Sequence, residues 1–394
     1  MSLNNTVSAE RVHIGFFGLR NAGKSSVVNA VTGQSLAVVS DVKGTTTDPV
    51  KKAMELLPIG PVVIIDTPGI DDEGDLGEKR VEKTHEILRK TDVAVLVVDA
   101  VKGKSQDDEN LISVFKEKNI PYIVAFNKSD LQSSPLKLTD NEILVSAVTG
   151  DGVNGLKEKI GALAKTKAEP KYIISDLIDK GDIVVLCIPI DESAPKGRLI
   201  LPQQMTLRDI LDANATAICC QPEELADTLS VLSNKPRLVI TDSQVFRKVS
   251  EIVPEDILLT SFSILMARYK GELSVLANGA EALRKIKTGD RILISEGCTH
   301  HRQCNDIGTV KLPGWIRKYT GAEPDFSFTS GGEFPDDLSG YSLVVHCGGC
   351  MLNEREMKNR LNIAKEQGVP IVNYGVAIAQ MNGILTRSLQ MFQK

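Results

Sequence analysis

Near the C-terminus, cysteine and histidine residues stand at spacings that suit a soft metal ion or an iron–sulfur cluster. Cys298 and His300 form one group, and His346, Cys347 and Cys350 form a second group farther along the chain. Cys347 and Cys350 make a Cys-x-x-Cys pair, in which one tight turn can direct two thiolates at one site. Three sulfurs without an obvious fourth favour an iron–sulfur cluster with one open iron over a closed zinc site, which requires four ligands.

Other residues near these groups keep a second interpretation open. Cys304 is a candidate partner of Cys298, although its spacing favours a free thiol in a loop. His300 is a candidate ligand, a hydrogen-bonding neighbour of the cluster or a loop cap, and His346 is a candidate for the layer around the ligands. A zinc site built from three cysteines and one histidine is therefore the competing interpretation.

The N-terminal region carries a phosphate-binding sequence. Residues 18–25 match the pattern Gly-x-x-x-x-Gly-Lys-Ser and directly follow an apolar strand expected at 11–17. Lys24 is expected to reach the β- and γ-phosphates, and the Ser25 hydroxyl is expected to bind Mg²⁺. The residues of this segment expected to contact the nucleotide are Gly18, Asn21, Gly23, Lys24, Ser25 and Ser26.

The next two motifs are expected to surround the γ-phosphate. In the threonine-rich segment 44–48, Thr46 is expected to close over Mg²⁺ and the γ-phosphate. An apolar strand expected at 61–65 ends in Asp-Thr-Pro-Gly, where Asp66 would hold Mg²⁺ through water and the Gly69 amide would face the γ-phosphate.

The last two motifs select the base. The sequence Asn-Lys-Ser-Asp follows an apolar strand expected at 122–126, and its Asp130 can accept hydrogen bonds from guanine N1–H and N2–H. The base-binding residues expected from these motifs are Asn127, Lys128, Asp130, Ser146 and Ala147. Five motifs in order after expected strands predict a protein that binds and hydrolyses GTP.

The residue that follows Asp-Thr-Pro-Gly is Ile70, whereas many GTPases carry a glutamine there to orient water. Intrinsic hydrolysis is therefore expected to be slow or to use another device. The region resembles GTPases of the tRNA-modification and Era type, some of which use an asparagine at the place of Asn21 to hold K⁺. The resemblance implies K⁺ stimulation through Asn21, for which a turn-forming role is the alternative. The expected catalytic residues are Lys24, Thr46, Asn21 and Gly69.

The strand and helix patterns predict an α/β protein, with a P-loop GTPase domain followed by two further α/β domains that have parallel sheets. The expected boundaries are 8–168, 171–268 and 269–394. The middle domain shows apolar strands and no catalytic constellation. Its charged loop 191–198 is interpreted as a solvated turn, with a loop that reaches the metal as the alternative. The expected strands and helices of the middle domain are 182–188, 207–211, 215–219, 224–232 and 237–240. Its three cysteines are expected to be small core residues, namely Cys187, Cys219 and Cys220.

The third domain places the two cysteine groups at one edge. Strands are expected at 291–295, 341–345 and 370–374, with Cys298 past the end of the first and Cys347 past the end of the second. Sites in open α/β sheets form at the carboxyl ends of parallel strands. The two groups are therefore expected to share one site.

Composition excludes several classes of protein. The chain has 394 residues, a net charge of −5 and 4% aromatic residues, which argues against a basic nucleic-acid-binding surface. No apolar run reaches the ~18 residues of a membrane span, and the N-terminus lacks a signal-peptide pattern. Cysteines in such a chain are ligands or buried thiols, so a cytoplasmic protein is expected.

The whole pattern, Cys-x-His and then His-Cys-x-x-Cys downstream of the GTPase motifs, resembles the [FeFe]-hydrogenase maturation GTPases, the HydF family. The resemblance covers the full chain and implies a homodimer formed through the middle domain. It also implies a [4Fe-4S] cluster bound by Cys298, Cys347 and Cys350, and a scaffold or carrier role for the transient diiron subcluster of the H-cluster. The implied partners are two radical-SAM maturases and the apo-hydrogenase. The alternative is a tRNA-modification or ribosome-assembly GTPase with a structural zinc domain.

Overall fold

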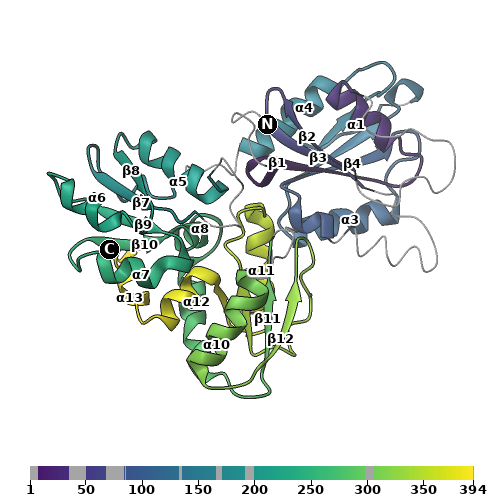
Figure 1. The fold of residues 1–394 in the computed structure, drawn as a ribbon. Coiled ribbons are helices and arrows are strands. Elements are labelled where there is room, and N and C mark those ends of the chain that lie inside the picture. The colour runs from purple at the N-terminus through teal and green to yellow at the C-terminus, as the bar shows by residue number, and fades with distance from the viewer. Residues whose placement is uncertain are drawn as a thin grey trace. The chain divides into compact units, whose positions relative to one another are not determined.

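The computed structural model describes most of the chain and groups it into two compact units. The units are residues 1–169 and 170–394, here the N-terminal unit and the C-terminal unit. Figure 1 shows three sheets, one in the N-terminal unit and two in the C-terminal unit. The described residues are 8–34, 50–67, 84, 86–132, 135–165, 171–190, 199–297 and 306–393.

The N-terminal unit is built on a six-stranded sheet in the order β2-β3-β1-β4-β5-β6. Its strands are β1 (Val12–Phe17), β2 (Val50–Leu56), β3 (Gly60–Asp66), β4 (Val93–Asp99), β5 (Tyr122–Asn127) and β6 (Glu142–Leu144). Only the pair β2 and β3 is antiparallel among the pairs of this sheet. Every residue of β4 is buried, as expected of a strand covered on both faces.

Helices cover both faces of this sheet. The helices are α1 (Lys24–Thr32), α3 (Gln106–Glu117) and α4 (Val153–Lys165). Apolar side chains of α1 and α4 share a core with one face of the sheet, and those of α3 share a second core with the other face. This layering leaves the loops at the carboxyl ends of the strands to form a site.

The first sheet of the C-terminal unit has four parallel strands in the order β10-β9-β7-β8. The strands are β7 (Ile183–Cys187), β8 (Thr216–Cys220), β9 (Leu238–Thr241) and β10 (Leu258–Ser261). The helices that accompany them are α5 (Leu201–Asp212), α6 (Leu225–Val231), α7 (Phe246–Ile252) and α8 (Phe262–Lys270). The edge strand β8 leaves Cys219 exposed, so the expectation that Cys219 is a core residue is wrong. Cys187 lies on the inner strand β7 and is buried.

The second sheet of this unit also has four parallel strands, in the order β12-β11-β13-β14. The strands are β11 (Arg291–Ser295), β12 (Asp325–Thr329), β13 (Leu343–His346) and β14 (Ile371–Asn373). The helices are α9 (Leu273–Gly279), α10 (Leu312–Thr320), α11 (Glu354–Glu366), α12 (Tyr374–Met381) and α13 (Leu385–Leu389).

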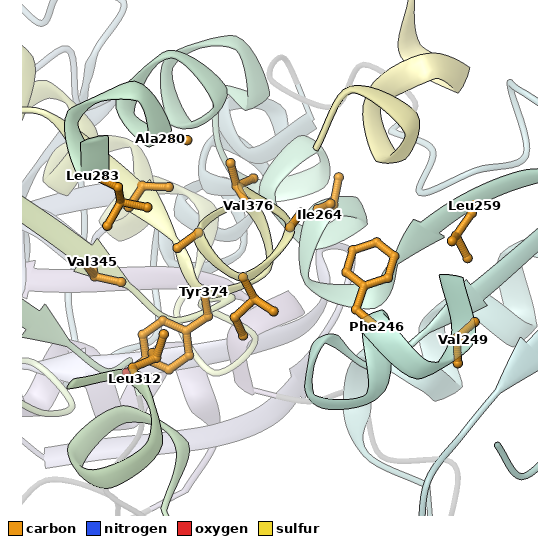
Figure 2. Close-up of a cluster of buried hydrophobic side chains, with 14 of the residues drawn as sticks. Phe246, Val249, Leu259, Ile264, Ala280, Leu283, Leu312, Val345, Tyr374 and Val376 are labelled. Carbon is orange, nitrogen blue, oxygen red and sulfur yellow. The ribbon is translucent and has the colours of Figure 1, made fainter. Parts of the chain in front are cut away.

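Helix α12 joins the cores of the two sheets. Figure 2 shows Tyr374 and Val376 of this helix among side chains that come from both sheet regions, including Phe246 and Val345. The helix approaches α8 closely, because a Cβ atom on Gly375 would lie 2.7 Å from Cβ of Ser263. One of the hydrophobic cores of the C-terminal unit therefore spans both of its sheets.

The observed architecture confirms the predicted fold class, an α/β protein with a P-loop domain and two further regions of parallel sheet. The predicted boundary between residues 268 and 269 stays a prediction. Among the helices that the structure describes, none has both the length and the apolar character needed to cross a membrane.

Candidate nucleotide site and cysteine turn

The phosphate-binding loop follows β1 and leads into α1. Gly23 is the N-cap of α1 and has a φ of 83°, in the left-handed region. A Cβ atom at this position would collide with the side-chain amide of Asn127, and one on Gly18 would collide with the carbonyl oxygen of Val97. Both positions therefore require glycine, and the N-terminus of α1 is free to direct backbone N–H groups toward an anion.

A cation, a hydroxyl and a carboxylate converge beside this loop. The ammonium of Lys24 lies 2.5 Å from Oδ1 of Asp66 and also donates to the backbone carbonyl of Thr67. The hydroxyl of Ser25 donates to Oδ2 of Asp66 over 3.3 Å. Lys24 and Asp66 are largely buried, with side chains 11% and 7% exposed. These are the group types that bind phosphate oxygens and Mg²⁺.

The predicted base-binding residues contact the same loop. Asn127 donates through Nδ2 to the Ala22 carbonyl over 3.0 Å and accepts at Oδ1 from the N–H of Ala147 over 3.1 Å. The hydroxyl of Ser146 donates to Oδ1 of Asp130 over 2.6 Å, which orients that carboxylate. The structure thus brings the residues predicted to bind the base and the phosphate loop together.

Several predicted site residues lie outside the described residues. They are Thr46, Gly69, Cys298 and His300, together with Ile70 and Cys304. Ser26 lies within α1, beside Ser25.

The cysteine turn, residues 347–350, begins directly after β13. The Sγ atom of Cys347 accepts hydrogen bonds from the N–H groups of Gly297 over 3.0 Å and Gly349 over 3.4 Å. Gly349 has a φ of 65°, so the turn depends on a residue without a Cβ atom. Because β11 and β13 are neighbours in register, the chain immediately before Cys298 contacts Cys347.

The protonation of the two thiols depends on their surroundings. Burial raises the pKa of Cys347 to about 11 and also raises the pKa of Cys350, where the Lys270 ammonium opposes the rise. Metal coordination deprotonates such thiols, because the cation replaces the proton. Sulfur ligands that already receive backbone N–H groups suit an iron–sulfur cluster or a soft metal. Within the described ranges no three potential metal ligands gather, and the predicted third ligand, Cys298, lies outside those ranges.

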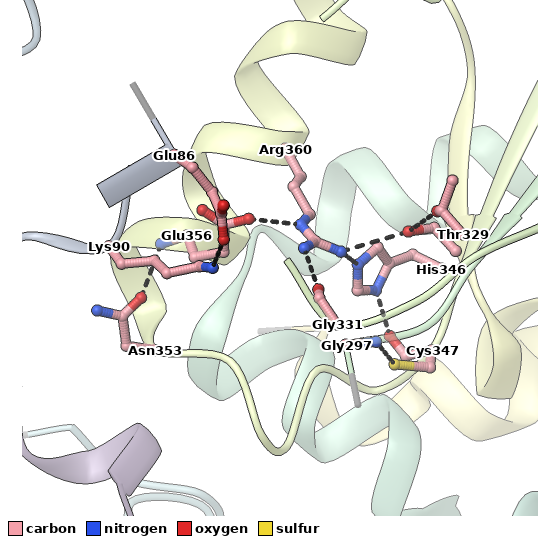
Figure 3. A network of polar contacts seen from close by, with 11 residues as sticks. Glu86, Lys90, Gly297, Thr329, Gly331, His346, Cys347, Asn353, Glu356 and Arg360 are labelled. Carbon is pink, nitrogen blue, oxygen red and sulfur yellow. Dashed lines mark hydrogen bonds and ion pairs between the residues drawn. The ribbon is translucent and has the colours of Figure 1, made fainter. Parts of the chain in front are cut away.

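His346, the last residue of β13, lies inside a polar network behind the turn. Its Nδ1–H donates to the carbonyl of Cys347 over 2.7 Å, and its Nε2 accepts from Arg360 over 3.0 Å (Figure 3). Burial and the nearby Arg360 lower the pKa of His346 to about 3, so the ring is neutral at pH 7. Both ring nitrogens of His346 thus have protein partners in this arrangement. This favours a place for His346 behind the predicted cysteine ligands over a role as a ligand.

Arg360 of α11 is fully buried and organises this network. It donates through Nε to Oε1 of Glu356 over 2.9 Å and through Nη2 to the carbonyl of Gly331 over 2.7 Å. Sequence reasoning missed Arg360, because nothing in the charged sequence of its helix distinguishes it from solvent-facing residues. It also missed Lys270, because a lysine at the end of a helix such as α8 is usually exposed to solvent.

Comparison with known protein families assigns all three sheet regions. Residues 13–128 match a 50S ribosome-binding GTPase domain. Residues 173–271 match a hydrogen maturase F dimerization domain, and residues 274–391 match a hydrogen maturase F tetramerization domain.

The curated relatives are similar to the N-terminal region. The tRNA modification GTPase MnmE of Nitrosomonas europaea is 32% identical over 162 residues, covering 40% of this chain and 35% of that protein. MnmE of Clostridioides difficile is 36% identical over 154 residues, covering 37% of this chain and 33% of that protein. GTPase Der of Wolinella succinogenes is 35% identical over 165 residues, covering 38% of this chain and 35% of that protein. The match thus spans about a third of each of these relatives.

A solved structure of Era from Aquifex aeolicus is 20% identical, with a TM-score of 0.36, and the alignment covers 53% of this chain and 92% of that one. The assignment of the family rests on the domain matches. The two hydrogen maturase F domains together span more than half of the sequence and follow a GTPase domain. The chain therefore belongs to the hydrogen maturase F family.

Proposed function

We propose that this protein is a GTPase that holds a [4Fe-4S] cluster and serves as scaffold or carrier for the diiron subcluster of the [FeFe]-hydrogenase H-cluster. The observation that carries the proposal is the hydrogen bond from Gly297 N–H to Sγ of Cys347, over 3.0 Å. It joins the segment that leads to Cys298 with the turn that contains Cys347 and Cys350. Three thiolates from these two segments can then hold one cluster.

GTP hydrolysis in this proposal depends on the converging groups beside the phosphate loop. Lys24 neutralises charge on the β- and γ-phosphates, and Ser25 holds Mg²⁺, with Asp66 acting through water. Thr46 and Gly69 contact Mg²⁺ or the γ-phosphate and transmit the nucleotide state to their loops. Asn21 helps to hold K⁺, which supplies the positive charge that Ile70 cannot provide.

The cluster site leaves one iron without a cysteine ligand. A cluster bound by Cys298, Cys347 and Cys350 offers an exchangeable position at which the incoming diiron unit, the cargo, can attach. The backbone N–H groups of Gly297 and Gly349 stabilise negative charge on Cys347, and His346 fixes the carbonyl of that residue. His300 is proposed to lie near the cluster.

The edge strand β8 is proposed as the surface at which two copies associate into a homodimer. Helix α13 packs against β10, the other edge strand of this sheet, whereas β8 leaves Cys219 exposed. Exposed apolar side chains lie on segments that flank β7 and β8, at Ile190, Leu211 and Val231. Pairing of two β8 edges would satisfy their backbone groups and cover this apolar surface.

The partners in this proposal are two radical-SAM maturases and the apo-hydrogenase, which meet the protein in the cytoplasm. A second candidate function is tRNA modification or ribosome assembly with a structural zinc site. It is favoured by the likeness of the N-terminal region to the MnmE and Der GTPases. The match of the remaining chain to hydrogen maturase F domains favours the first function.

Anaerobic reconstitution tests the proposal. The purified protein is loaded with iron and sulfide, assayed for iron and zinc, examined by EPR after reduction, and offered to apo-hydrogenase after incubation with the maturases. A reducible [4Fe-4S] signal and activation of the hydrogenase are expected. Cys347→Ser should remove both, whereas the matched control Cys219→Ser, at an exposed thiol on β8, should retain both. Stoichiometric zinc without iron after anaerobic purification would favour the second function.

A further inference from the structure

Lys270, the last residue of α8, is almost completely buried beside the cysteine turn, with 2% of its surface exposed. Its ammonium donates hydrogen bonds to the carbonyl oxygen of Cys350 over 3.0 Å and to that of Leu352 over 2.9 Å. A buried lysine is rare, because removing its charge from water is costly unless other groups compensate. The charge is therefore held at the point where the chain leaves the cysteine turn.

The rest of α8 lies along the same turn. A Cβ atom on Gly348 would lie 3.6 Å from Oγ of Ser263 and 4.0 Å from Cβ of Met266, both on α8. The helix lies in the region that matches the dimerization domain, and the turn lies in the region that matches the tetramerization domain. Lys270 thus connects the two regions directly at the cysteine turn.

A fixed positive charge near an iron–sulfur cluster favours the reduced state, because reduction adds a negative charge. The low polarity of the surroundings strengthens such an interaction.

We propose that Lys270 is a positioning residue that anchors the cysteine turn through the carbonyls of Cys350 and Leu352, and that its charge raises the reduction potential of the bound cluster. The proposal rests on the proposed function, because it requires a cluster at Cys347 and Cys350. It assigns to the end of α8 a role in the chemistry of the neighbouring region.

Three substitutions separate the charge from the hydrogen bonds. Lys270→Gln keeps N–H donors without the charge, Lys270→Met removes both, and Lys270→Arg keeps both. The control is Arg387→Gln, which removes a cation that donates to the carbonyls of Val253 and Pro254, away from the cysteine turn. Each full-length protein is reconstituted anaerobically, its iron is measured, and its reduction is titrated by EPR.

The midpoint potentials of Lys270→Gln and Lys270→Met are expected to shift to more negative values. Lys270→Arg and Arg387→Gln should stay close to the wild-type protein, and Lys270→Met should also bind less iron. If the methionine variant fails to fold, the midpoint potential of the glutamine variant alone tests the proposal. Unchanged potentials in the neutral variants would overturn the proposal. Failure of the proposed function has a different signature, because the wild-type protein itself would then show no reducible cluster.

Discussion

The ammonium of Lys128 donates a hydrogen bond to the backbone carbonyl oxygen of Asn21 over 2.8 Å. The same ammonium lies 2.6 Å from Oδ2 of Asp99, at the end of β4. The segment predicted to recognise guanine is therefore bonded to the middle of the phosphate loop. Asn21 adopts a φ of 62°, in the left-handed region that asparagine tolerates better than most residues.

Removing the charge of Lys24 should abolish catalysis and leave cluster loading intact. Lys24→Ala is expected to lower the rate of GTP hydrolysis at least ~100-fold, because no other group replaces its charge at the phosphates. Phosphate release measures the rate, and iron analysis after reconstitution measures loading. Lys104→Ala, which removes a lysine paired with Glu142 in the same unit, should keep the activity. Loss of the cluster in Lys24→Ala would contradict the prediction that the nucleotide site and the cluster site are independent.

The response to potassium should depend on the side chain of Asn21. Hydrolysis is expected to be several-fold faster in KCl than in NaCl at equal ionic strength. Asn21→Gly should remove this difference, since glycine permits the same backbone conformation but offers no side-chain ligand. The carbonyl that accepts from Lys128 is retained in this variant, so GTP binding should persist. Equal rates of the wild-type protein in the two salts would refute the role of K⁺.

The three predicted ligands should be individually indispensable. Serine at Cys298, Cys347 or Cys350 should eliminate the reducible [4Fe-4S] signal in EPR, because a cluster held by two thiolates is labile. Cys304→Ser should be tolerated, and His300→Ala should keep the cluster but alter its spectrum.

The open iron has its own test. Added imidazole should perturb the EPR spectrum of the wild-type protein, because an exchangeable position accepts a small ligand. A Cys304→Ser variant without a cluster would indicate four thiolates and no exchangeable position.

Self-association should not require the cluster. The protein stripped of iron is expected to remain a dimer by light scattering at micromolar concentration, since stable dimers bury more than ~2,000 Å². Cys219→Lys should weaken it by placing a charge on β8, whereas Val148→Lys, at an exposed apolar position of the N-terminal unit, should not. A monomeric wild-type protein, or a Cys219→Lys variant that dimerises normally, would argue against the β8 surface.

Features encoded by neighbouring residues could be predicted from the sequence. Strand β11 begins and ends at the predicted residues 291 and 295, and the residues around Lys24 and Asn127 converge as their motifs indicate. The exposure of Cys219 could not be predicted, because it depends on the place of β8 at the edge of the sheet.

The buried cations are a second class of feature beyond sequence reasoning. Lys270 of α8 donates to the carbonyl of Cys350 in the cysteine turn, and Arg360 of α11 donates to His346, which directly precedes the turn. No local pattern marks a lysine or an arginine that will be enclosed by the fold.

Helix α12 lies between the two sheets of the C-terminal unit and contributes to one core with both, although the two sheets match separately named domains. Separating the sheets would expose the side chains that surround Val376 and Ile378. The two regions should therefore melt in a single transition. Chains that combine one of these regions with the other region of a different family member would fold poorly. In evolution they are expected to be inherited as a pair.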